Sequence, residues 1–140
     1  MSATYWDSGA VVMALGDDAL RNRLNQPDQF TRPHTLAEVF SVLTGGKLGR
    51  KYPQDEAAAL LDQVRTEIAF VELTPEDMTG AMKRAKALGV RGGQVHDLMH
   101  CVAADKCGAE TLVTTDRNDL KGLTRATIEV LEDPPAQAPA

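Results

Sequence analysis

Long apolar runs are missing from this sequence, and their absence argues against a membrane-spanning chain. No stretch approaches the roughly 20 apolar residues that a membrane-spanning helix needs. The N-terminus also lacks a basic segment followed by an apolar one, so no secretory signal peptide is expected. The 140 residues are enough for one domain with a core of its own. We therefore expect a single globular domain that works away from the membrane.

Cysteine is scarce as well, because the chain has only Cys101 and Cys107. In one predicted helix, a separation of six residues places them about 9 Å apart along the axis and on different faces. Such a pair does not form a disulfide. Neither does any Cys and His spacing resemble a zinc site. Reduced thiols favour a cytoplasmic location.

An excess of positive charge is also missing. The formal net charge is -5 at pH 7, whereas a protein that coats nucleic acid is basic. Any nucleic-acid ligand would therefore need a local basic patch, or metal ions that offset the acids. Lys47, Arg50 and Lys51 form a compact basic cluster, which either contacts phosphates or is a solvated loop. Arg117 is the better candidate for binding a phosphate or the carboxylate of a partner.

Short apolar strands alternate with helical stretches along the chain. The periodicity predicts strands at 3–6, 29–31, 68–71, 111–114 and 128–130, and helices beginning near 8, 17, 35, 53, 74 and 94. This alternation predicts an α/β fold, a three-layer α/β/α sandwich with a mostly parallel central sheet. We expect residues 1–131 to form this domain and the Pro- and Ala-rich residues 132–140 to be a disordered tail.

Two helix starts have recognisable capping sequences. Thr35 followed by Glu38 is a capping-box pattern, which predicts that the third helix begins after Thr35. Thr74 followed by Pro75 predicts another helix start. The apolar period of that helix continues to Leu88, so one helix is expected up to Gly89.

Acidic residues recur where a parallel sheet would bring them together. Asp7 and Asp116 each follow an apolar strand, while Glu38 and Asp97 lie near the starts of helices. In such a fold the strands end and the helices begin at one rim of the sheet. Carboxylates gathered there repel one another, and a hard divalent cation such as Mg²⁺ relieves that repulsion. A site of this kind activates water and holds a phosphodiester for attack, and Asp119 is a fifth candidate ligand.

Each acid also has a purely structural interpretation. Asp7 could cap the helix that follows it, and Glu38 could be the partner in the capping box or lie on a solvated face. Asp97 could complement a helix dipole, and Asp116 could form an Asx-turn. Taken singly, each acid favours the structural interpretation, and only the set of four favours a metal site.

The three histidines lie close to these acids in the sequence. His100 is three residues after Asp97 and therefore on nearly the same helix face. We expect it to be a surface or packing residue, with a contact to substrate or phosphate as the alternative. His34 and His96 have the same two interpretations.

Four segments together resemble the PIN domain. They are Tyr-Trp-Asp-Ser-Gly-Ala at 5–10, Leu-Ala-Glu-Val at 36–39, His-Asp-Leu-Met-His-Cys-Val-Ala-Ala at 96–104 and Leu-Val-Thr-Thr-Asp-Arg-Asn-Asp-Leu at 112–120. Size and order resemble the VapC-type toxins of bacterial toxin–antitoxin pairs, over residues 3–130.

The resemblance implies a Mg²⁺- or Mn²⁺-dependent endoribonuclease that hydrolyses RNA. Carried over by position, Asp7, Glu38, Asp97 and Asp116 are its catalytic and metal-binding acids, and Asp119 is an accessory metal ligand. The resemblance also implies a homodimer and a small antitoxin that blocks the site.

Two other functions stay open. The first is a metal-dependent phosphatase or a receiver-like domain, although a receiver needs paired acids at the first strand and a lysine after a late one. Asp7 has no acidic neighbour, and no lysine closely follows Thr114. The second is a non-catalytic α/β binding domain in which the acids only cap helices.

Overall fold

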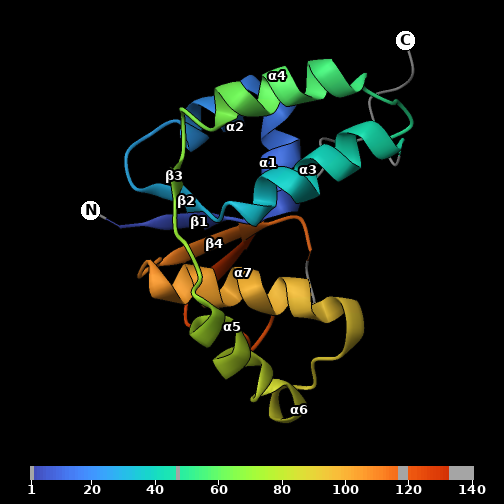
Figure 1. The fold of residues 1–140 in the computed structure, drawn as a ribbon. Helices are drawn as coiled ribbons and strands as arrows, with labels where there is room; N and C mark the ends of the chain where they lie inside the picture. Colours follow the sequence, from blue (N-terminus) through green and yellow to red (C-terminus); the bar gives the residue numbers. More distant parts are fainter. Residues whose placement is uncertain (1, 47, 117–119, 133–140) are drawn as a thin grey trace.

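A parallel β-sheet forms the centre of the computed structural model, which describes residues 2–46, 48–116 and 120–132. The sheet has five strands in the order β3-β2-β1-β4-β5, and each neighbouring pair is parallel (Figure 1). The strands are β1 (Thr4–Trp6), β2 (Gln29–Thr31), β3 (Ala69–Phe70), β4 (Thr111–Thr114) and β5 (Thr127–Val130). The predicted α/β class and parallel sheet are confirmed.

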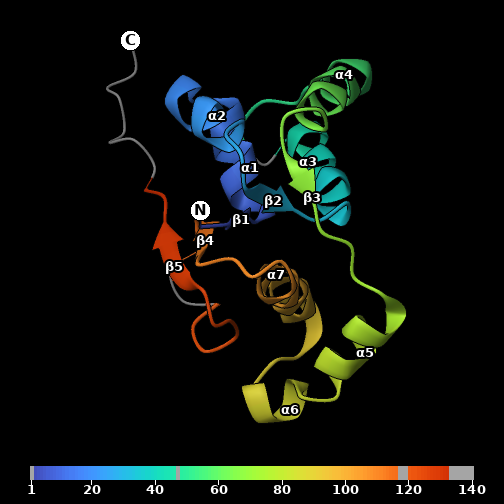
Figure 2. The same cartoon turned by 90° about the vertical axis from the view of Figure 1, so that its left-hand side faces the viewer.

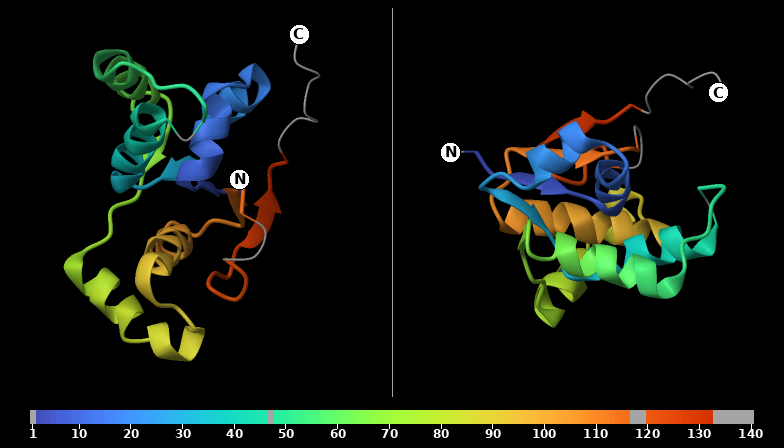
Figure 3. Two further views of the ribbon diagram at one scale, coloured as in Figure 1. Left: turned by 90° about the vertical axis from the view of Figure 1, so that its right-hand side faces the viewer. Right: turned by 90° about the horizontal axis from the view of Figure 1, so that it is seen from above.

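Helices cover both faces of the sheet. One face carries α1 (Ser8–Leu15), α2 (Asp18–Leu24), α3 (His34–Gly45) and α4 (Gln54–Val64) (Figure 1). The other carries α7 (Val95–Lys106), preceded by the short 3-10 helix η1 (Gly92–Gln94) (Figure 2). Outside α7 lie α5 (Pro75–Met82) and α6 (Ala85–Leu88) (Figure 3). The three predicted layers are therefore present.

Alternation along the two central strands divides the core into two halves. Trp6 and Val113 are fully buried in the half that contains α1, α3 and α4. Tyr5 and Leu112, their neighbours in the sequence, are fully buried on the opposite face with residues of α7. Because the middle of each strand is buried on both faces, apolar or aromatic side chains follow one another at Tyr5–Trp6 and at Leu112–Val113. These two strands are the rigid support from which Asp7 and Asp116 extend.

The predicted capping box at Thr35 is wrong. Helix α3 already begins at His34, and the cap position is Pro33, which makes no side-chain cap hydrogen bond. Thr35 is fully buried, and its hydroxyl accepts a hydrogen bond from the Thr31 hydroxyl at 2.8 Å. The hydroxyl is thus used to join α3 to the end of β2, and Glu38 is left for other contacts.

The single helix predicted for 75–88 is also wrong, because it is divided into α5 and α6 at Lys83 and Arg84. Its start is as predicted, with a capping box between Thr74 and Asp77. The division allows Met78 and Leu88 to pack against the same cluster around Leu98 and Met99. Tertiary packing on α7 therefore overrides the continuous helical period.

None of the helices in the described ranges is long and apolar enough to cross a membrane. The two cysteines are both free, as expected from their spacing. Most of the predicted tail, residues 133–140, lies outside the described residues, so the expectation of a disordered tail stays a prediction.

Candidate active site

Asp7 is the acid most deeply embedded in the fold. It directly follows β1, and its backbone N–H donates to the Val113 carbonyl of β4 at 3.1 Å. Its Oδ1 accepts a hydrogen bond from the Ala10 N–H at 2.9 Å, so it caps α1, as the structural interpretation proposed. The side chain is nevertheless nearly inaccessible, with the residue only 7% exposed. Burial therefore raises the pKa of Asp7, although nearby His100 and a hydrogen bond from Thr114 act in the opposite direction.

Asp116 leaves the neighbouring strand at the same rim. β1 and β4 are adjacent and parallel, with Trp6 opposite Val113. Asp116 follows two residues after Thr114, whose buried hydroxyl accepts a hydrogen bond from the Asp116 N–H at 3.0 Å. A side chain at Gly9 would collide with Thr115, so the start of α1 and the exit of β4 are in close contact. This close packing fixes where the two acidic strand ends lie.

Glu38 reaches the site from the second turn of α3. Its Oε1 lies 3.0 Å from His100 Nε2 and 3.5 Å from an Arg32 guanidinium nitrogen. Partial burial raises the pKa of Glu38, but His100, Arg32 and His34 outweigh that effect and lower it. The pKa of Glu38 is therefore held below its ordinary value, and Glu38 lies near enough to Asp7 to contribute to the raised pKa of Asp7.

His100 links these acids to the core of the sheet. It is 2% exposed, and its Nδ1 lies 2.7 Å from the Tyr5 hydroxyl. An ionised Glu38 carboxylate can only accept, so the facing Nε2 carries a proton, and in the neutral ring Nδ1 then accepts from the Tyr5 hydroxyl. Nε2 also lies 3.5 Å from the Ser8 hydroxyl. The sequence favoured a surface or packing role for His100, but the residue also contacts Glu38 and Tyr5. The sequence feature that could have indicated this is its position three residues after Asp97 on the same helix.

Asp97 lies in the first turn of α7, one helical turn before His100. Asp97 and Asp7 both lie close enough to Cys101 to contribute to its raised pKa, although burial is the largest cause and Asp105 the next. His100 thus contacts Glu38 and lies near enough to Asp7 to affect the pKa of Asp7, and Asp97 lies on the helix that supplies this histidine. Asp119, Arg117 and Lys47 lie outside the described residues, and their predicted roles stay predictions.

The donor atoms suit a hard cation, but they do not form a closed cage. Within residues 2–46, 48–116 and 120–132, no three His, Cys, Asp or Glu side chains are grouped so that they could hold a metal ion. Mg²⁺ does not require such a group, since it keeps several waters and binds through one or two carboxylates. A buried carboxylate beside a second ionised one is an arrangement that a bound cation would stabilise. Chemically, these carboxylates are of the type that Mg²⁺ and Mn²⁺ take as ligands.

Comparison with known proteins gives structural matches only. No family model and no curated protein sequence matches the chain. Among solved structures, DNA-bound VapBC from Salmonella typhimurium matches with a TM-score of 0.70 and 14% identity, over 93% of this chain and 98% of that one. VapBC2 from Rickettsia felis, bound to a fragment of its promoter DNA, gives 0.69 and 16%, over 93% and 99%. The sarcin-ricin loop cleaving toxin VapC20 from Mycobacterium tuberculosis gives 0.62 and 19%, over 84% and 92%.

The chain has a VapC-type PIN fold. Of the four candidate acids, Glu38 lines a cavity of about 540 Å³. Its lining combines hydroxyl, carboxylate and imidazole groups with two apolar side chains, namely Ser8, His34, Ala37, Glu38, Ser41, Val42 and His96. Glu38 and two hydroxyl side chains, Ser8 and Ser41, therefore share one polar cavity.

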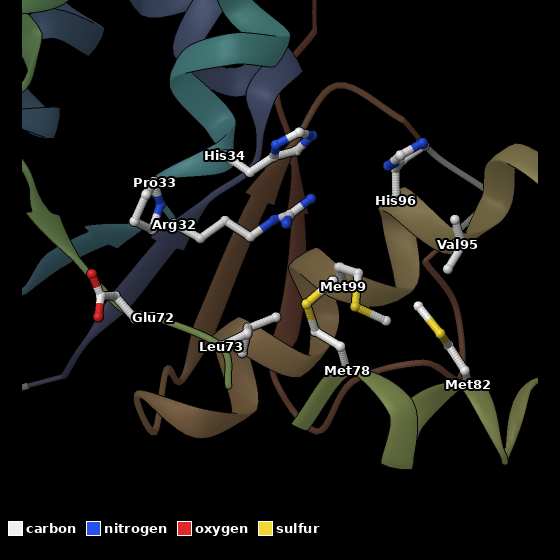
Figure 4. Close-up of a pocket in the computed structure, with 10 residues that line it drawn as sticks. All are labelled: Arg32, Pro33, His34, Glu72, Leu73, Met78, Met82, Val95, His96 and Met99. Atoms are coloured by element: carbon white, nitrogen blue, oxygen red, sulfur yellow. The ribbon is translucent and has the colours of Figure 1, made fainter. Parts of the chain in front are cut away.

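A second, more apolar groove adjoins it in the PIN fold, with a volume of about 510 Å³. Three methionines, Met78, Met82 and Met99, line it together with Arg32 (Figure 4). The two hollows have His34 and His96 in common, so a bound molecule could extend from one into the other.

Proposed function

We propose that this chain is a metal-dependent endoribonuclease that hydrolyses RNA phosphodiester bonds and acts as the toxin of a toxin–antitoxin pair. The observation that carries the proposal is the placement of Asp7, at the carboxyl end of β1, and of Glu38, in α3, near His100 in a VapC-type fold. Support for RNA as the substrate comes from VapC20, a toxin that cleaves the sarcin-ricin loop.

In this proposal Asp7, Glu38, Asp97 and Asp116 are the catalytic acids and hold Mg²⁺ or Mn²⁺, with Asp119 as an accessory ligand. The ion would supply Lewis-acid stabilisation of the phosphate and would activate the attacking water. The Glu38 carboxylate is held in one orientation by the hydrogen bond from His100, which is itself fixed by Tyr5. Asp7 is fixed by its cap bond to Ala10, so neither acid has to reorganise.

The partners also belong to the proposal. We infer a small antitoxin that covers the acidic site, supported by the two VapBC structures of the same fold. A homodimer and a cytoplasmic location complete the model, the latter consistent with two free cysteines in the described residues.

Purified chain incubated with total RNA and Mg²⁺ tests the activity, with each of the four acids replaced in turn. Cleavage that each replacement abolishes supports the proposal. The competing function is a non-catalytic binding domain, which is favoured by one observation, the cap bond from Asp7 to α1. That alternative predicts no cleavage and no effect of Mg²⁺ on the melting temperature. Hydrolysis of an aryl phosphate without cleavage of RNA would instead indicate a phosphatase.

A further inference from the structure

His34 and His96 are a pair of aromatic rings next to the acids, and neither metal binding nor hydrolysis uses them. Their ring planes differ by only 15°, and their centroids are 6.2 Å apart. Both residues are exposed, one as the first residue of α3 and the other as the second of α7. Figure 4 shows the two rings side by side, extending from separate helices. The pair is thus a surface feature that the fold assembles from distant parts of the chain.

The fold places this pair directly beside the candidate catalytic acids. His34 and Glu38 are four residues apart in α3, so they lie on the same helix face. His34 is also near enough to contribute to the lowered pKa of Glu38. Both rings share the cavity of Glu38 and Ser8. A molecule with a reacting group at the acids therefore has its adjacent portion at the two rings.

The other side of the pair is apolar. The groove that shares His34 and His96 contains Met78 and Met99, whose thioethers are polarisable and adapt to flat ligands. With the proposed divalent cation at the carboxylate end, a ligand that fits both hollows has an anionic group there and a planar, largely apolar group at the ring end. A nucleotide unit has this composition, with its phosphate and its base.

We propose that His34 and His96 form a stacking platform for an unpaired nucleobase adjacent to the phosphodiester that is cleaved. This inference rests on the proposed ribonuclease function and adds a base-binding subsite to it. Unpaired RNA bases stack on aromatic side chains, histidine included, and such contacts tolerate different bases. The net charge of -5 gives the chain little general attraction for RNA, so ring contacts supply affinity that charge does not.

The test is steady-state cleavage of a single-stranded oligoribonucleotide by three double variants. Replacing both histidines by Ala removes the rings, replacement by Phe keeps rings without charge, and replacement by Lys keeps charge without rings. We expect KM to rise about tenfold in the Ala variant, with kcat affected less, because stacking binds the ground state as well as the transition state. The Phe variant should restore the KM and the Lys variant should not. Gln63→Ala, on the exposed face of α4, is the matched surface control.

An unchanged KM in the Ala variant would overturn the platform, and so would rescue by Lys without rescue by Phe, which indicates a phosphate contact. Fluorescence anisotropy of labelled RNA in EDTA measures binding without cleavage, so it separates this inference from the ribonuclease proposal. It is measured with the wild-type chain, with Glu38→Gln and with each double variant. Ring-dependent binding by a wild-type chain that cleaves nothing would overturn the hydrolysis and keep the platform. Cleavage by a chain whose RNA binding does not depend on the rings would support the hydrolysis and overturn the platform.

Discussion

Glu38 and Tyr5 are joined through His100, whose Nε2 lies 3.0 Å from the Glu38 Oε1 and whose Nδ1 lies 2.7 Å from the Tyr5 hydroxyl. The two bonds come from opposite sides of one buried ring, so the orientation of Glu38 depends on a residue of the central strand. A histidine used in this way aligns a carboxylate rather than reacting itself. It is therefore a positioning residue.

His100→Asn should weaken binding of Mn²⁺ and slow RNA cleavage, each by about 10- to 100-fold, which is the usual effect of losing a residue that orients a metal ligand. The reason is that the shorter amide does not reach Glu38. Mn²⁺ titration followed by electron paramagnetic resonance measures the affinity without any RNA. An affinity equal to that of wild type, in a variant with a cooperative melt, would show that His100 only fills space.

Tyr5→Phe should destabilise the fold by about 1–3 kcal/mol, because it leaves the buried Nδ1 of His100 without its donor. Urea unfolding of both chains measures the difference. Tyr52→Phe, in the loop before α4, is the control and should change the unfolding free energy by less. Equal stabilities for wild type and Tyr5→Phe would mean that the hydroxyl contributes nothing through this bond.

Replacing Asp7 separates its cap bond from its charge. Asn keeps the acceptor for the Ala10 N–H and Ala does not, so Asp7→Ala should be less stable than Asp7→Asn by about 0.5–2 kcal/mol. In EDTA at neutral pH, Asp7→Asn should be at least as stable as wild type, because it buries no charge. Thermal melts of the three chains test both expectations.

The same comparison has a predicted pH dependence. Burial holds the pKa of Asp7 above its ordinary value of 3.8 in the folded chain. Its contribution to stability is fully present below 3.8 and is lost as the pH rises through the folded-state pKa. Wild type should therefore lose stability relative to Asp7→Asn over that interval. Glu38 has the opposite shift, but it is present in both chains and cancels. A difference that does not vary with pH would contradict the burial of this charge.

The acids at the strand ends could be predicted from sequence because each lies within two residues of the end of a short apolar strand. The middle residues of β1 and β4 are buried on both faces, so each strand contains a short apolar run that can be recognised in the sequence. Asp7 and Asp116 follow the ends of these strands. Two helix details could not be predicted. Thr35 has the sequence of a cap, but a bond to Thr31 in the core takes its hydroxyl. The break between α5 and α6 depends on packing against α7.

The contacts of the histidines were also beyond the sequence. His100 and Tyr5 are 95 residues apart, and only the packing of α7 on β1 makes them partners. His34 and His96 become neighbours for a similar reason, since α3 and α7 begin at the same rim on opposite faces of the sheet. Sequence spacing predicts which acids lie at one rim, whereas the side chains that orient them come from long-range contacts.

Expression of the wild-type chain alone should arrest growth, and co-expression with its antitoxin should relieve the arrest and yield a co-purifying complex. The physical reason is that an acidic site accepts a basic side chain from a small partner. Asp7→Asn expressed to the same level is the control and should not arrest growth. A chain that cleaves RNA in vitro but leaves growth unaffected would argue against the toxin role.

Cleavage of RNA by the purified chain in Mg²⁺ and in EDTA, compared among wild type, Asp7→Asn, Glu38→Gln, Asp97→Asn and Asp116→Asn, tests the central claim most directly. We expect wild type to cleave in Mg²⁺ or Mn²⁺, to stop in EDTA and to recover when the ion is returned. Each variant should lose most of its activity while it remains folded, as judged by its melt. Full cleavage in EDTA, or variants as active as wild type, would contradict a metal-dependent ribonuclease built on these four acids.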